Sequence, residues 1–138
     1  MRLLTRNLIA AAALSLAAGY ATADVKVGFM ATMSGSAAAL GQDMYDGFML
    51  ALEQNGGKLG GQKIDLVKED DQLKPDVGVQ IVQKFIEKDK VDIVAGVTFS
   101  NVMMAIAKPL ADADMTFVGS NAGPAPLAGK QCNKGFFF

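Results

Sequence analysis

Three segments rich in small and short polar residues have the composition of a site for a small anion. They span residues 34–42, 97–101 and 120–123. Small side chains let the backbone approach a ligand closely, and they leave amide N–H groups free to donate. A carboxylate accepts such donors, so the segments predict a site for a small molecule that carries one.

Ser100 and Asn101 are the sharpest candidates within these segments, because they stand where a predicted strand becomes a helix. A hydroxyl, a side-chain amide and the unpaired backbone donors of a first helical turn would all point into one anion-sized space. The alternative is that Ser100 is simply the N-cap of that helix. Phe99 would supply an apolar wall or belong to the core.

Asn121, Ala122 and Gly123 follow the last of the predicted long strands and are interpreted as a backbone donor loop held by Pro124. An ordinary turn is the alternative, since Asn, Gly and Pro are common turn residues.

Leu40 and Gln42, at the start of the first predicted helix, are candidates to close the pocket. A hydrophobic staple followed by a helix start would explain the same pattern.

Enzymatic chemistry has little support in the sequence. There is no His among the 138 residues, which removes the usual catalytic base and the commonest zinc ligand. Neither a Gly-x-Ser-x-Gly motif nor a nucleotide-binding glycine motif occurs. The run Glu69-Asp70-Asp71 lacks the ligand spacing of a calcium loop and is interpreted as a solvated strand end. We therefore expect no enzyme, no metal and no cofactor.

The N-terminus has the pattern of a cleaved export signal. Arg2 and Arg6 precede an apolar core over residues 8–18, and Ala21-Thr22-Ala23 predicts cleavage before Asp24. The apolar stretch is shorter than the roughly 20 residues that a membrane-spanning helix requires. Without residues 1–23 the chain keeps 11 of its 13 basic and all 14 acidic residues, a formal charge of −3. This mild acidity argues against nucleic acid as a partner.

Strand and helix patterns alternate along residues 24–138, which form one domain long enough for a core. Strands are predicted over 25–30, 63–68, 91–96 and 115–119, with a candidate fifth strand beginning at Phe136. Helices are predicted over 42–55, 75–88 and 100–113, with a bend or early stop at Pro109. This alternation predicts an α/β fold: a doubly wound parallel sheet with helices on both faces. Ligands of such sheets bind beyond the carboxyl ends of the strands, where the three small-residue segments would converge.

Several motifs, in order, carry a resemblance to a known family. The strings 28–35 and 39–47, the acidic run 69–71, the helix beginning at Pro75 and the pair Ser100-Asn101 resemble the leucine/isoleucine/valine-binding protein family. The resemblance implies a type I periplasmic binding fold of Rossmann or flavodoxin-like topology, in which two lobes shut on a ligand. Residues 24–138 would be the N-terminal lobe, incomplete and without its second lobe; a natural short chain is the alternative.

The resemblance also implies a function. It predicts a periplasmic, monomeric substrate-binding component of an ABC importer, which takes up a carboxylate-bearing solute and delivers it to permease subunits. By position, Leu40, Asn101, Asn121 and Gly123 would contact ligand. A ligand sensor with the same fold and no transport role is the alternative.

Two points stay open at this level. The family usually has a Ser/Thr-rich run after the third strand, whereas residues 97–101 read Val-Thr-Phe-Ser-Asn. This departure resembles the branch that takes up aromatic or other organic acids, so a branched-chain amino acid and an organic acid are both candidate ligands. Cys132, the single cysteine, either pairs beyond residue 138 or is an unpaired thiol.

Overall fold

Strands and helices alternate along residues 24–138, the part of the chain that the computed structural model describes. The predicted export signal, residues 1–23, lies outside the described residues. The elements, in chain order, are β1 (Val25–Ala31), the 3-10 turn η2 (Gly35–Ala37), α2 (Ala38–Gln54), β2 (Lys58–Leu59), β3 (Gln62–Asp70), α3 (Pro75–Lys84), the π-helical turn η3 (Phe85–Asp89), β4 (Ile93–Gly96), α4 (Ser100–Asp112), β5 (Thr116–Gly119) and β6 (Phe136–Phe137).

These strands form one sheet in the order β2-β3-β1-β4-β5-β6. All neighbouring pairs are parallel except β2 and β3, which form an antiparallel edge. The predicted parallel sheet is thus confirmed, including a fifth parallel strand at Phe136. The short strand β2 was not among the predicted strands. After β1 the chain moves to β3 on one side and then to β4 on the other, so strand order reverses at β1.

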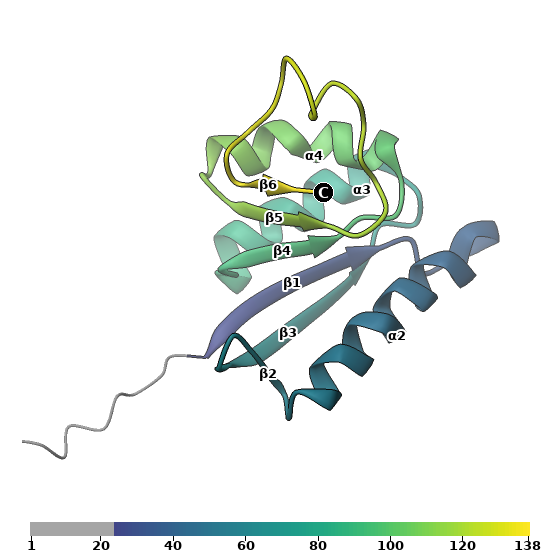
Figure 1. The fold of residues 1–138 in the computed structure, drawn as a ribbon. Helices are drawn as coiled ribbons and strands as arrows, with labels where there is room; N and C mark the ends of the chain where they lie inside the picture. Colours follow the sequence, from purple (N-terminus) through teal and green to yellow (C-terminus); the bar gives the residue numbers. More distant parts are fainter. Residues whose placement is uncertain (1–23) are drawn as a thin grey trace, which may run out of the picture.

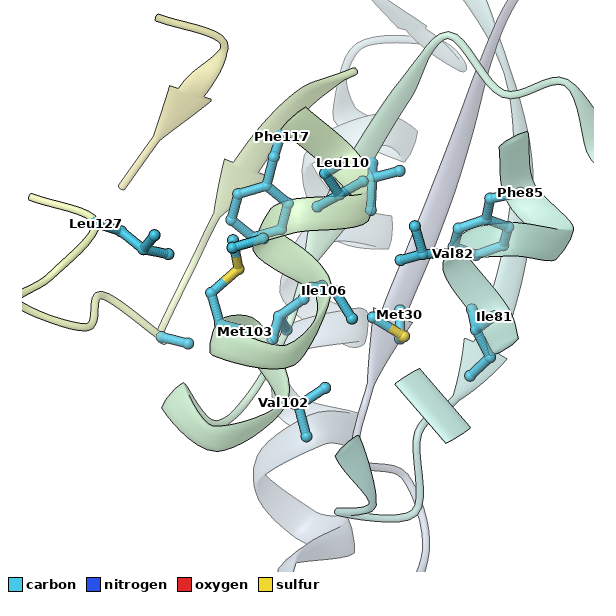
Figure 2. Packing of buried hydrophobic residues seen from close by; sticks show 14 of the residues in the cluster. Met30, Ile81, Val82, Phe85, Val102, Met103, Ile106, Leu110, Phe117 and Leu127 are labelled. Atoms are coloured by element: carbon cyan, nitrogen blue, oxygen red, sulfur yellow. The ribbon is translucent and has the colours of Figure 1, made fainter. Parts of the chain in front are cut away.

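Helices cover both faces of the sheet, as predicted, but unequally (Figure 1). α3 and α4 lie side by side on one face and enclose the larger apolar core. Figure 2 shows how side chains of the two helices point toward the strands and toward one another. The labelled residues of that core are Met30, Ile81, Val82, Phe85, Val102, Met103, Ile106, Leu110, Phe117 and Leu127. Burying this much apolar surface is the main stabilising contribution to the domain.

The opposite face carries α2 alone. Tyr45 and Phe48 of this helix pack against Phe29 of β1, with ring centroids 5.5 and 5.3 Å away. α2 leaves part of this face open, and a groove of about 490 Å³ lies beside the helix, lined by residues of α2 and of the strands β1 to β5. Its apolar lining includes Ile93 and Val118, and Val118 is 44% exposed. One face of the sheet is therefore only partly covered by residues 24–138.

Helix boundaries differ from the sequence prediction, and the helix predicted over 75–88 is divided into α3 and the π-helical turn η3. α2 begins at Ala38 rather than at residue 42, because the preceding small residues already form the 3-10 turn η2. Pro109 was expected to bend or stop the third helix, yet α4 continues to Asp112. Pro109 removes the hydrogen bond to the Ala105 carbonyl, but the fully buried Ile106 and Leu110 hold this end of the helix in the core.

Gly41 provides a direct test of how closely α2 approaches the end of β1. A Cβ atom added at Gly41 would lie 1.9 Å from the Thr32 carbonyl oxygen, whereas one added at Gly47 in the same helix meets nothing within 4 Å. Gly41→Ala should therefore lower the free energy of unfolding by about 1–3 kcal/mol through overpacking. Gly47→Ala should raise it by about 0.5–1 kcal/mol through helix propensity. Urea denaturation measures both, and equal effects of the two substitutions would contradict the close approach.

Candidate functional site

The carboxyl ends of β1, β4 and β5 meet at one edge of the sheet, and the small-residue segments follow these ends. The register aligns Met30 of β1 with Gly96 of β4, and Gly96 with Gly119 of β5. The arrowheads of the three strands point the same way in Figure 1. Because strand order reverses at β1, this edge includes the place where ligands of open parallel sheets bind.

Thr98 joins the loops that follow β1, β4 and β5. Its hydroxyl accepts a hydrogen bond from the backbone N–H of Thr32 at 2.9 Å. Its carbonyl oxygen accepts one from the side-chain amide of Asn121 at 2.6 Å. In addition, the N–H of Val97 donates to the Met30 carbonyl at 2.6 Å. Segments 97–101 and 120–123 are thus connected directly. The sequence predicted that they meet at one sheet edge, but not which residues connect them.

The turn out of β4 has an unusual backbone. Gly96 has φ +103, and a Cβ atom there would lie 2.4 Å from the Met30 carbonyl oxygen, so only glycine fits. Val97 follows with φ +63, a conformation that is rare for a β-branched residue. Strain of this kind costs on the order of 1–3 kcal/mol and persists only where surrounding contacts enforce it. The turn brings Thr98 and the start of α4 over the sheet edge.

The first turn of α4 has no side-chain cap. The N-cap residue is Phe99, with φ −126 and ψ 143, and no side-chain hydrogen bond caps the helix. The interpretation of Ser100 as the N-cap is therefore wrong by one residue, because Ser100 is already helical. Ser100 and Asn101 are both exposed, and Phe99 is half-buried beside them. Backbone N–H groups of an uncapped first turn carry partial positive charge and favour an anion.

The loop after β5 offers fewer free donors than predicted. The N–H of Ala122 donates to the Val97 carbonyl at 3.3 Å, and Ala122 is 3% exposed. The side-chain amide of Asn121 is engaged by Thr98. Gly123 is exposed and lines a pocket of about 250 Å³ together with Asn121 and Phe138. The structure thus gives Ala122 a role in packing, although it lines the same pocket as Asn121 and Gly123.

Leu40 and Gln42 lie in the first turns of α2, on its exposed surface. Leu40 is 40% exposed. The side-chain amide of Gln42 donates to Asp46 at 2.7 Å, four residues along the same helix. Between them, Gly41 packs against Thr32 and holds the helix start at the sheet edge. A role in closing the pocket stays a prediction for both side chains.

The acidic run, in which Glu69 and Asp70 end β3 and Asp71 follows it, is not a solvated strand end, which corrects the sequence interpretation. Asp71 is fully buried and accepts hydrogen bonds from the Thr32 hydroxyl at 2.5 Å and the Leu73 N–H at 2.9 Å. Asp70 accepts from the N–H groups of Met33 at 2.8 Å and Gln72 at 2.9 Å. Bonds from the N–H two residues later are typical of Asp at turns, which is the signal that sequence reasoning missed.

Two features are absent from residues 24–138. No cluster of three or more His, Cys, Asp or Glu side chains in this range is arranged to hold a metal ion. None of the helices in it combines the length and the apolarity needed to cross a bilayer.

Comparison with known proteins gives one family. The family model described as periplasmic binding protein matches residues 24–138. A curated relative from Brucella abortus (strain 2308), a Leu/Ile/Val-binding protein homolog, is 31% identical over 125 residues, which are 89% of this chain and 32% of the relative. The match covers 32% of this relative and 21% of an amino acid binding protein from Pseudomonas aeruginosa, so the chain spans a third or less of the length of these curated relatives.

Solved structures agree with this match. A solute-binding protein of an ABC transporter from R. palustris, in complex with benzoate, is 32% identical with a TM-score of 0.79, covering 83% of this chain and 32% of that one. A second solute-binding protein from R. palustris, in complex with 4-hydroxybenzoate, is 30% identical with a TM-score of 0.74. The match covers 83% of this chain and 31% of that one. This chain is similar to one lobe of each.

Asp70 makes a pH-dependent contribution to the site scaffold. Burial raises the pKa of its carboxyl, but hydrogen bonds from Met33, Ser34 and Gln72 outweigh burial and lower the pKa overall. A lowered pKa stabilises the fold above the unfolded-state pKa of about 3.9, and this contribution disappears as the pH falls through the folded-state value.

Asp70→Asn should therefore destabilise the fold at pH 7, and the difference from the unmodified chain should shrink as the pH falls from 5 toward 2. Urea unfolding across this pH range measures the difference. Asp65→Asn on the same strand is the control, because the Asp65 side chain is 57% exposed and forms a surface ion pair with Lys26. If the free energy of unfolding of Asp70→Asn stays below that of the unmodified chain by the same amount at every pH, the role given to Asp70 is wrong.

Proposed function

The chain belongs to the periplasmic binding protein family, and from this premise we propose that it acts as the substrate-binding component of an ABC importer. In this role it captures a small carboxylate-bearing solute in the periplasm and delivers it to the membrane permease. The relatives from R. palustris are solute-binding proteins of ABC transporters, which supports the proposal. Residues 1–23 would direct export and then be removed.

The observation that carries the proposal is the uncapped first turn of α4, next to the point where strand order reverses. Its free N–H groups, the Ser100 hydroxyl and the Asn101 amide can all donate to one anion. Several donors to one carboxylate, reinforced by the helix dipole, give a stable site without a positively charged side chain. The backbones of Asn121 and Gly123 would complete the site from the β5 side.

We further propose that the ligand is an aromatic carboxylate rather than an α-amino acid. Two relatives at 30% identity or more were solved with benzoate and 4-hydroxybenzoate. Phe99 is half-buried beside the anion-binding turn and offers an apolar wall for a ring. An ammonium group would need an acceptor, yet Asp70 at this edge is engaged by donors of the chain itself and Asp71 is fully buried.

Residues 24–138 are proposed to be the first lobe of a two-lobed receptor. The chain spans a third or less of its relatives' length, and the part of the sheet face that α2 leaves open offers apolar surface for further chain to cover. The ligand would lie between the lobes, so that burying it favours the closed form, which the permease reads. One lobe alone desolvates one side of the ligand and should bind it more weakly than the pair.

Thermal-shift screening of a chain carrying this lobe together with a second lobe tests the proposal, because a ligand that binds the folded state raises the melting temperature. Benzoate should raise it, whereas benzamide, which has nearly the same shape and no charge, should not. Leucine provides the amino-acid comparison. A shift with leucine and none with benzoate would overturn the aromatic assignment, and no shift with any carboxylate would overturn the site.

Asn101→Ala in the same two-lobe chain is expected to weaken benzoate binding at least tenfold, on the order of 1.4 kcal/mol. The reason is the loss of a side-chain amide that donates to the carboxylate. Gln83→Ala is the matched control, since Gln83 is an exposed amide on α3, away from the site. Isothermal titration calorimetry measures both affinities. An Asn101→Ala affinity equal to that of the control would remove Asn101 from the site.

A further inference from the structure

Hydrogen bonds link the ends of four neighbouring strands in the same order as the sheet, β3-β1-β4-β5. Asp71 after β3 accepts from the N–H of Leu73 and from the hydroxyl of Thr32 after β1. The N–H of Thr32 donates to the hydroxyl of Thr98 after β4. The carbonyl of Thr98 accepts from the amide of Asn121 after β5. We call this series, Asp71, Thr32, Thr98 and Asn121, the strand-end ladder.

We infer that the strand-end ladder, with Thr98 at its centre, positions the anion-binding first turn of α4 and so sets the affinity of the site. Thr98 is a positioning residue in this account and does not touch the ligand. The inference rests on the proposed function, because it assigns positioning residues to the same site.

Burial supports this role. Thr32, Asp71 and Thr98 are the buried polar side chains in the described part of the chain, with exposed fractions of 0%, 0% and 1%. All three belong to the ladder. Burying polar groups costs free energy unless each is paired, so a fold seldom collects them in one place without a structural purpose. Here they collect at the sheet edge where the site lies rather than in the apolar core beneath α3 and α4.

Asp71 sets the direction of the hydrogen bonds at one end of the ladder, because a carboxylate can only accept. Its oxygen Oδ1 accepts from both the Leu73 N–H and the Thr32 hydroxyl, and its oxygen Oδ2 is buried with no hydrogen-bond partner among the described residues. Asp71 is therefore the accepting end of the ladder. Thr32 donates twice, once by its hydroxyl and once by its N–H, which fixes its backbone between β3 and β4.

Thr98 is the central residue because it forms hydrogen bonds both to the end of β1 and to the loop after β5. Its hydroxyl is tied to β1, its carbonyl to the β5 loop, and its backbone lies between the strained Val97 and the N-cap Phe99. Loss of the hydroxyl would leave the Thr32 N–H without its partner and the left-handed turn with less support. The first turn of α4 would then move relative to β1, although none of the residues proposed to contact the ligand is substituted.

The test compares Thr98→Val, which keeps the shape and loses the hydroxyl, with Thr98→Ser, which keeps the hydroxyl. Amide hydrogen exchange in the 138-residue chain reports on the turn through the Met103 and Ala122 N–H groups, which bond to the carbonyls of Phe99 and Val97. Thr98→Val should speed exchange at both at least tenfold relative to Val82 in the α3 core, and Thr98→Ser should stay within threefold. Equal acceleration at all three amides would indicate general destabilisation and overturn the inference.

Benzoate affinity gives the second readout, measured in the two-lobe chain by equilibrium dialysis well below the melting temperatures. Thr98→Val should bind at least tenfold more weakly than the unmodified chain, and Thr98→Ser within twofold. Equal affinities would overturn the inference and leave the proposed function intact. If the unmodified chain binds no carboxylate, the proposed function fails, and the exchange pattern alone decides whether Thr98 positions the turn.

Asn121→Ala covers the case in which Thr98→Val does not fold. Asn121 is exposed, so its truncation should be tolerated, and it removes the donor to the Thr98 carbonyl. Exchange at Ala122 should again accelerate at least tenfold relative to Val82. Unchanged exchange at Ala122 would overturn the inference.

Discussion

The hydrogen bond from the Thr32 N–H to the Thr98 hydroxyl connects the two strand ends on either side of the point where strand order reverses. At such a point two loops diverge to opposite faces of the sheet and leave a crevice between them. Without a connection across the crevice, the start of α2 and the start of α4 would be positioned independently. The Thr32–Thr98 bond makes them one unit, and the bonds to Asp71 and Asn121 extend that unit to β3 and β5.

The rest of the domain provides a rigid base for this unit. α3 and α4 bury a continuous apolar core on one face, and the fully buried Val102 and Ile106 fix the axis of α4 close to its N-terminus. On the other face Gly41 allows α2 to touch the Thr32 carbonyl. Packing therefore sets where the helices lie, and the buried polar groups set where their first turns point. The uncapped N–H groups of α4 are left facing solvent at a fixed place, which is what preorganised recognition of an anion requires.

The sequence predicted the architecture well because its signals are local. Alternating β-branched and helical patterns gave the order of elements, and the parallel sheet with its edge of small-residue loops followed from that order.

The finer assignments depend on long-range pairing, which a single sequence does not show. Ser100 looked like a cap, but the strained turn at Gly96 and Val97 moves the helix start one residue earlier. Asp71 looked solvated, yet its partner is Thr32, 39 residues away. Ala122 looked like a free donor, but its N–H donates to the carbonyl of Val97 in the loop that follows the neighbouring strand β4.

The central claim is that a small carboxylate binds at the first turn of α4. The most direct measurement is a titration of the ¹⁵N-labelled 138-residue chain with benzoate, followed by amide chemical shifts, because it locates weak binding residue by residue. The account predicts that the largest shifts occur at Ser100, Asn101 and Gly123, with little change at Ile93 and Val118 in the groove beside α2. Shifts concentrated at Ile93 and Val118, or none at the start of α4, would contradict it.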